Sequence, residues 1–292
     1  MQNFLELVDV SLKKYNTLRL DAHAKRLYFP LNKEGLVDVL RLSKGFKRYL
    51  LGKGSNVLLM RETYPEDVIF IVTSLMDDIH IENEELVLES GVSLSQLTWF
   101  AIEHAIDGYA FAEDIPGTIG GALIMNAGQF EFTIGQYVHW VDVYDEIDDE
   151  VKRIYPEASF FTYRNSGFKA HETILACGLR NVGGDELENI EKVISYKKER
   201  YRKQPRNYPN AGSVFKRPQK DGKALFVWKL FEECGLRGQR VGDAEISFKH
   251  PGFIVNLGNA TQADVLTLIE LCKEEVKQHF DVDLELEWRV LD

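Results

Sequence analysis

The sequence predicts an α+β protein with a substantial hydrophobic core. Its 292 residues are 45% hydrophobic and include 17 Phe, 12 Tyr and 4 Trp, enough for one large domain or two to three smaller ones. Short apolar runs bounded by turn residues alternate with segments of helical periodicity. No stretch approaches the apolar length that a membrane-spanning helix needs.

Composition limits the classes of partner. Asp and Glu number 46 against 35 Lys and Arg, a net charge of -11 that argues against general nucleic-acid binding. The N-terminal residues 1–6 lack the basic and apolar regions of an export signal, so we expect a cytoplasmic protein without a membrane partner. Cys177, Cys234 and Cys272 are too widely spaced for a disulfide framework or a zinc motif, and no metal site is expected.

The first third contains a candidate phosphate cradle. Residues 35–43 predict a helix, and strands at 49–51 and 57–60 flank the turn Gly52-Lys53-Gly54-Ser55-Asn56. A glycine-punctuated turn between two buried strands brings backbone N–H groups close together, which suits an anion. An ordinary tight hairpin is the alternative.

A second glycine-rich run follows strands at 68–72 and 86–89 and a helix predicted over 93–106. It reads Ile115-Pro116-Gly117-Thr118-Ile119-Gly120-Gly121 and continues to Gly128 with few bulky polar side chains. Such a run lets a planar or phosphorylated ligand approach the main chain. A buried loop with small-residue helix packing explains it equally well.

Arg164 lies between predicted strands at 138–144 and 173–182, among the aromatic residues Tyr163 and Phe168. A surface guanidinium stacked on one of these rings is the simplest interpretation. A helix predicted over 187–203 ends within a segment dense in Lys and Arg, which contains Lys197, Lys198, Arg200, Arg202, Lys203 and Arg206.

The segment Asn210-Ala211-Gly212-Ser213-Val214-Phe215-Lys216 places a hydroxyl beside a flexible glycine, just after this basic segment. It places a possible proton donor beside a possible anion-binding site, although a solvated helix end followed by a turn at 209–212 also fits.

The last third of the chain predicts a helix at 224–234, a strand at 253–255 and a helix that begins with a capping box at 261–264. In the final strand Leu284, Leu286, Trp288 and Val290 share one face, so Glu287 points to water or to a site.

Taken in order, eight motifs make the chain resemble the UDP-N-acetylenolpyruvoylglucosamine reductase family, also called UDP-N-acetylmuramate dehydrogenase. The motifs begin at Asn16, Leu51, Ile115 with Met125, Tyr163, Lys203, Ala211, Lys249 and Leu284. The short interval between Arg164 and Ser213 resembles the branch that lacks an extra loop with a substrate-contacting tyrosine.

The resemblance implies a two-subdomain FAD-binding fold of the PCMH or vanillyl-alcohol-oxidase type, followed by a C-terminal α+β substrate-binding domain. The implied ranges are 1–70 and 71–185 for the FAD-binding subdomains and 200–282 for the substrate domain, with the strand 283–292 returning near the site. It assigns FAD binding to Gly52, Lys53, Gly54, Ser55, Asn56, Pro116, Gly117, Thr118, Gly120, Gly121 and Asn126.

The resemblance also implies an NADPH-dependent flavoprotein oxidoreductase of peptidoglycan precursor synthesis, and hence of cell-wall biogenesis, cell shape and division. Arg164, Ser213 and Glu287 match the catalytic residues, and Lys203, Arg217 and His250 are expected near the substrate's diphosphate or sugar. The expected partners are NADPH and a UDP-sugar, and a monomer is expected.

Two departures from the family pattern lie beside the second glycine-rich run. Asp114 stands where relatives usually have Gly, and Gln129-Phe130-Glu131-Phe132 replaces a smaller, tyrosine-bearing segment. Added carboxylates make the local potential more negative, which bears on rate and nucleotide preference. The alternatives are a divergent FAD oxidoreductase with another substrate, or a non-catalytic flavin or nucleotide-sugar binding protein.

Overall fold

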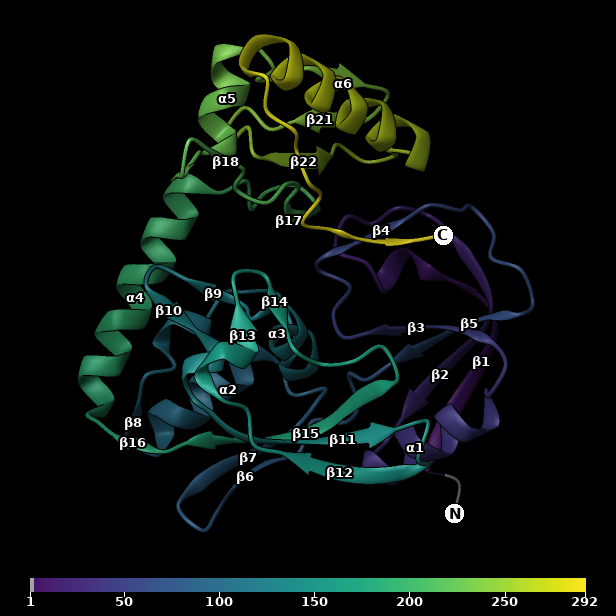
Figure 1. The fold of residues 1–292 in the computed structure, drawn as a ribbon, viewed down its shortest axis with the longest axis vertical. Helices are drawn as coiled ribbons and strands as arrows, with labels where there is room; N and C mark the ends of the chain where they lie inside the picture. The colour runs from purple at the N-terminus through teal and green to yellow at the C-terminus, as the bar shows by residue number, and fades with distance from the viewer. Residues whose placement is uncertain (1–2) are drawn as a thin grey trace. The chain divides into compact units, whose positions relative to one another are not determined.

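The computed structural model describes residues 3–292, whose helices and strands are labelled in Figure 1. These residues form two compact units. The first holds the described residues up to Val8 with Arg26–Lys53 and Asp67–Glu199. The second holds Asp9–Lys25, Gly54–Glu66 and Arg200–Asp292. Because the chain crosses between units several times, each unit is built from separate stretches of sequence. The predicted ranges 1–70, 71–185 and 200–282 stay a prediction, and Met1 and Gln2 lie outside the described residues.

The first unit contains parts of a four-stranded sheet with the order β1-β2-β5-β3. Its strands are β1 (Phe4–Ser11), β2 (His23–Pro30), β5 (Val68–Val72) and β3 (Lys47–Leu51). β5 is buried along its whole length and runs parallel to both β2 and β3. Helix α1 (Lys33–Leu42) packs its apolar face against Ile69 and Ile71 of β5, which confirms the helix predicted at 35–43.

A five-stranded antiparallel sheet with the order β12-β11-β15-β7-β6 supplies the other core of this unit. Its strands are β6 (Ile79–Glu82), β7 (Glu85–Glu89), β11 (Val138–Asp145), β12 (Glu150–Ile154) and β15 (Glu172–Arg180). In the sequence, helices α2 (Leu94–Glu103) and α3 (Ile119–Met125) lie between β7 and β11, and the long helix α4 (Glu186–Lys203) follows β15. Two-residue strands complete the unit: β8 (Ile106–Asp107), β9 (Gly128–Gln129), β10 (Phe132–Thr133), β13 (Phe161–Thr162), β14 (Asn165–Ser166) and β16 (Val182–Gly183).

Helix α2 is shorter than the helix predicted over 93–106. Ser93 caps it in a capping box with Gln96, as its residue type favours. The helix ends at Glu103 because Ala105 adopts φ 51, in the left-handed region, and Ile106 then joins β8.

The second unit is a four-stranded sheet, β17-β22-β21-β20, with the helices α5 (Val227–Glu233) and α6 (Gln262–Phe280) in the same core. The strands are β17 (Asn210–Ser213), β20 (Arg240–Val241), β21 (Ala244–Ile246) and β22 (Phe253–Asn256), with the small pair β18 (Gln219–Lys220) and β19 (Lys223–Ala224). The capping box predicted for α6 is confirmed: Thr261 and Asp264 each accept a hydrogen bond from the other's backbone N–H.

The C-terminal segment differs from the strand predicted over the last ten residues. Strand β23 covers Arg289–Leu291 and runs parallel to β4 (Val57–Leu59). Leu284 and Trp288 are buried as expected, but Val290 is 41% exposed and Leu291 takes the buried position. The predicted alternation fails here because its phase shifts where the segment joins β4.

Candidate active site

The turn at residues 52–56 follows β3, and its glycines are required by close packing. β4, the strand after the turn, pairs with β23 in a sheet separate from that of β3, so the turn is not a hairpin. Gly54 adopts φ 59, and a Cβ placed there would lie 2.0 Å from the carbonyl oxygen of Tyr15. Only glycine fits this backbone.

The second glycine-rich run meets this turn at Gly52. A Cβ on Gly52 would lie 2.1 Å from Oγ1 of Thr118, and one on Gly120 would lie 3.1 Å from the Cβ of Ser90. The buried hydroxyls of Thr118 and Ser90 have no hydrogen-bond partner among the described residues. Buried hydroxyls are normally paired, so these two donors suit a polar ligand in the cradle.

These observations fit an FAD phosphate group: two loops with glycines at their closest approach, two unpartnered hydroxyls and the cation Lys53. Burial lowers the pKa of Lys53, while the charge of Glu113 acts in the opposite direction. Ser90 was not predicted as a site residue. Its neighbour Gly91 is required by close packing, because a Cβ there would lie 1.8 Å from the carbonyl oxygen of Thr73, and this glycine was the available sign of a tight backbone at Ser90.

Arg164 lies at the tip of the β13–β14 hairpin. Its φ of 55 is unusual for a residue with a long side chain, and its guanidinium lies 5.3 Å from the centre of the Tyr163 ring. Asn126, which ends α3 in the left-handed conformation, donates to the carbonyl of Thr162 at 3.0 Å. Backbone strain of this kind is frequent where a side chain has a function.

Ser213 ends β17, where a turn was the alternative interpretation. The strand pairs with β22, with a bulge between Asn210 and Ser213, and Gly212 adopts φ 80 there. Ser213 is half-buried and pairs with Phe253 of β22. The bulge re-aims the side chains of the strand, as bulges do beside active sites.

Glu287 lies on the segment next to the one that carries Ser213. Its backbone N–H donates to the carbonyl of Val214 at 2.8 Å, and its own carbonyl accepts from the Asn56 amide at 3.0 Å. The second unit therefore brings together Ser213, Glu287 and Asn56, which are far apart in the sequence. Arg164 belongs to the first unit.

His250 and Lys203 lie close enough to interact. Burial lowers the pKa of His250, and the charges of Arg237 and Lys203 lower it further. The His250 ring packs edge-on against Phe253, the partner of Ser213 in the sheet. The guanidinium of Arg217 lies 5.0 Å from the centre of the Phe226 ring.

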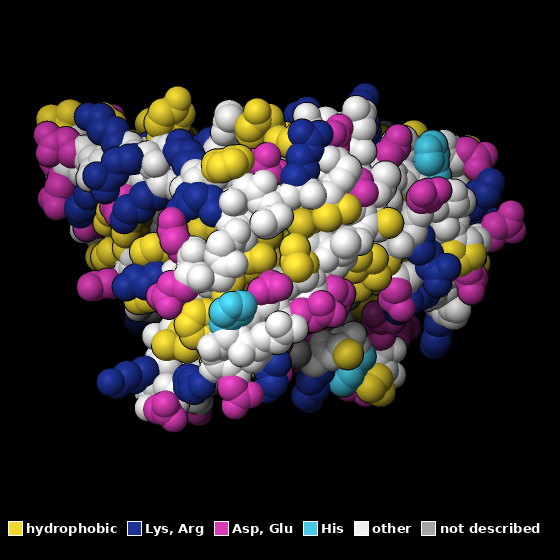
Figure 2. Space-filling model, turned by 90° about the horizontal axis from the view of Figure 1, so that it is seen from above, with side chains coloured by type: hydrophobic (Ala, Val, Ile, Leu, Met, Phe, Trp, Pro, Cys, Tyr) yellow, Lys and Arg dark blue, Asp and Glu magenta, His cyan; other side chains and the backbone are white. Residues whose placement is uncertain are grey.

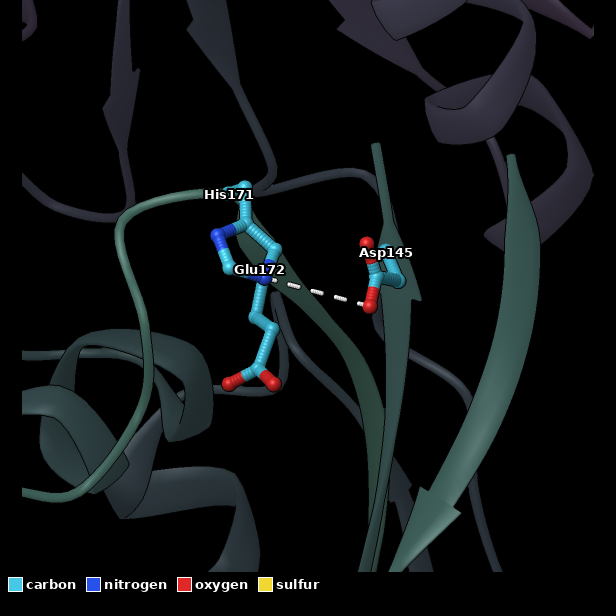
Figure 3. Close-up of side chains that lie close together, drawn as sticks. All are labelled: Asp145, His171 and Glu172. Carbon is cyan, nitrogen blue, oxygen red and sulfur yellow. Dashed lines mark ion pairs between the residues drawn. The ribbon is translucent and has the colours of Figure 1, made fainter. Parts of the chain in front are cut away.

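A separate group of possible metal ligands lies at one end of the five-stranded sheet. Figure 3 shows the His171 ring facing Asp145, with 3.9 Å between Nε2 and the carboxylate, and Glu172 beside it. Asp145 is already bound by Lys152 at 2.7 Å and by the backbone N–H groups of Ile147 and Asp148. The Lys152 hydrogen bond lowers the pKa of Asp145 to about 2, so this carboxylate serves the β11–β12 turn.

The surface in Figure 2 intersperses acidic, basic and hydrophobic side chains over the face that it displays. Within residues 3–292 no helix combines the length and the apolar character needed to cross a membrane.

Comparison with known proteins matches both parts of the chain to family models. An FAD binding domain matches residues 24–154, and the C-terminal domain of UDP-N-acetylenolpyruvoylglucosamine reductase matches residues 204–291. Curated reductases of this name are similar over nearly the whole chain. The Thermotoga maritima protein is 36% identical, covering 94% of this chain and 95% of its own. The Caldicellulosiruptor saccharolyticus protein is 37% identical, covering 96% of this chain and 90% of its own.

The crystal structure of UDP-N-acetylenolpyruvylglucosamine reductase from Thermus caldophilus superposes with a TM-score of 0.79 at 28% identity, covering 100% of both chains. The predicted fold, an FAD-binding region followed by this family's C-terminal domain, is confirmed. The chain therefore belongs to the UDP-N-acetylenolpyruvoylglucosamine reductase family.

Proposed function

We propose that this chain is the FAD-dependent enzyme that reduces the enolpyruvyl group of UDP-N-acetylglucosamine enolpyruvate to UDP-N-acetylmuramate with NADPH, in peptidoglycan precursor synthesis. One observation carries the proposal. An FAD-binding domain and the family's C-terminal domain stand on one chain that is 36% identical to curated reductases over 94% of its length. A cytoplasmic monomer remains part of this proposal.

The flavin phosphates would be held by the two glycine-rich segments. The hydroxyls of Thr118 and Ser90 and the ammonium of Lys53 supply donors, and the missing side chains at Gly52 and Gly120 allow close approach. Held there, FAD would supply the hydride chemistry that links NADPH to the enolpyruvyl double bond.

Hydride addition drives electron density onto the substrate carboxylate, so positive charge or a hydrogen-bond donor there lowers the barrier. Arg164 is assigned this role on the family resemblance, through the motif that begins at Tyr163. Glu287 orients a water or Arg164, or donates in its protonated form. Its own backbone N–H donates to the carbonyl of Val214 and its own carbonyl accepts from the Asn56 side-chain amide, and these two bonds fix its position on the segment.

Ser213 completes the reaction by transferring its hydroxyl proton to the carbon beside the carboxylate. A free serine is a weak acid, so the proton moves as negative charge develops on that carbon, and the serine oxygen must then be reprotonated. The half-buried position of Ser213 at a bulge supports this assignment.

Lys203, Arg217 and His250 are assigned to the diphosphate or sugar of the substrate. Lysine binds phosphate through a single compact charge, whereas arginine can form two parallel hydrogen bonds to its oxygens. His250 is held toward its neutral form, which suits a hydrogen bond to a sugar hydroxyl better than a second positive charge.

The departures at Asp114 and 129–132 keep a second candidate in view, an FAD oxidoreductase with another substrate. Phe130, in the second of these departures, stacks on Tyr196 of α4 with ring centres 4.4 Å apart. The test is NADPH oxidation by the purified yellow protein. We expect it to accelerate on addition of the enolpyruvyl UDP-sugar, whereas no response to that compound favours the second candidate.

A further inference from the structure

The buried carboxylate of Glu113 lies beside the start of the second glycine-rich run, Ile115 to Thr118, which we call the flavin loop. No role has been assigned to this carboxylate above. Glu113 is 4% exposed, although it is ionisable and directly precedes Asp114 and the run that begins at Ile115. Charged groups are seldom buried to this degree without partners. Its contacts therefore indicate what it does.

Each carboxylate oxygen of Glu113 has its own partner on a different helix. Ser95, in the first turn of α2, donates to Oε2 at 2.6 Å, and Lys197 of α4 donates to Oε1 at 2.8 Å. Lys197 also lies 3.9 Å from the carboxylate of Asp114. Glu113 thus ties the start of the flavin loop to two helices, all within the first unit.

The loop held in this way ends at the cradle. The carbonyl of Gly117 accepts from Leu94 N at 3.1 Å, and Thr118 packs against Gly52, next to Lys53. Glu113 also acts electrostatically on Lys53, offsetting part of the burial that lowers this lysine's pKa. Loss of the Glu113 carboxylate would therefore let the start of the loop shift and displace Thr118. It would also remove a negative charge that acts on Lys53.

We propose that Glu113, clamped by Ser95 and Lys197, is a positioning residue for FAD: it fixes the Ile115 to Thr118 loop against which the flavin phosphates bind. The inference rests on FAD as the cofactor of the proposed function. Lys197, one of the basic residues of the segment before Ser213, thereby serves the cofactor loop.

Two physical accounts predict opposite effects of Glu113→Ala on FAD binding, and they also differ for Ser95→Ala. If Glu113 acted only through its charge, Glu113→Ala would make the cradle more positive and tighten FAD binding, Lys197→Met would weaken it, and Ser95→Ala would leave it unchanged. If Glu113 positions the loop, all three substitutions weaken binding, because each removes a hydrogen bond to a buried carboxylate or the carboxylate itself.

The measurement is the dissociation constant of FAD from the apoprotein, followed by flavin fluorescence, with the visible spectrum of the bound flavin as a second readout. We expect the Kd to rise about tenfold for Glu113→Ala and Lys197→Met and a few-fold for Ser95→Ala. The absorption bands of the bound flavin should shift toward those of free FAD.

Lys192→Met is the matched control. It removes the same charge from the same helix, where Lys192 pairs with Asp107 at 3.0 Å and with Glu188 at 3.0 Å. We expect its Kd to stay within about twofold of the unmodified protein. Tighter binding by Glu113→Ala, or an equal loss in Lys192→Met, overturns the positioning role. Failure of the unmodified protein to bind FAD would instead refute the proposed function.

Discussion

At the scale of single residues, the most informative departure from the family pattern is Asp114. Its φ of 70 lies in the left-handed region, where a Cβ costs energy and glycine does not. The family's usual glycine at this position thus has a backbone explanation that the sequence alone could only suggest. We expect Asp114→Gly to be more stable than Asp114→Ala by about 1 kcal/mol in urea unfolding. Equal stabilities would mean that this backbone is unstrained.

His250 gives a residue-scale prediction about pH. Its pKa is lowered from 6.5 in the folded protein, so on acidification the unfolded chain takes up this proton first. The stability contributed by the neutral ring is present above pH 6.5 and is lost as the pH falls from there toward the lowered folded value. We expect His250→Gln to flatten the fall in unfolding free energy below that pH. Identical slopes for the two proteins would contradict the buried, neutral ring.

At the scale of elements, the contact between the two glycine-rich segments is testable. A Cβ at residue 52 would overlap the Thr118 side chain, so we expect Gly52→Ala to raise the FAD Kd at least about tenfold. Gly183→Ala is the control, because a Cβ there meets nothing within 4 Å. If fluorescence titration gave the same Kd for both variants, the two segments would not form one cradle.

Elements set by local periodicity could be predicted from the sequence, whereas those set by distant partners could not. α6 has its capping box within one short stretch of sequence, so its start was predicted. The strand character of β17, where a turn was the alternative interpretation, depends on β22, and β23 changes phase where it pairs with β4. Neither partner is near in the sequence, so neither feature could be predicted from local pattern.

The candidate site shows the same division. The glycine-rich cradle segments could be recognised as such because the requirement for glycine is local. The roles of Ser95 and Lys197 could not, since nothing local shows that either side chain binds Glu113. Lys197 is 84 positions from the carboxylate that it binds. The roles of Arg164, Ser213 and Glu287 remain predictions that rest on the family resemblance.

At the scale of the whole molecule, the central claim is that one chain runs two successive half-reactions, flavin reduction by NADPH and flavin reoxidation by the enolpyruvyl UDP-sugar. Only the second requires a proton from the protein at the carbon beside the carboxylate. Ser213 lies in the second unit, whereas Thr118 and Lys53 of the cradle lie in the first. Because only flavin reoxidation needs this proton, removal of the Ser213 hydroxyl should slow reoxidation and leave flavin reduction unchanged.

The most direct measurement is stopped-flow absorbance of the flavin in Ser213→Ala, mixed first with NADPH and then with the enolpyruvyl UDP-sugar. We predict that bleaching by NADPH proceeds as in the unmodified protein, while the return of colour with substrate slows by at least about a hundredfold. Recovery at the unmodified rate would contradict Ser213 as the proton donor, and the proposed mechanism with it.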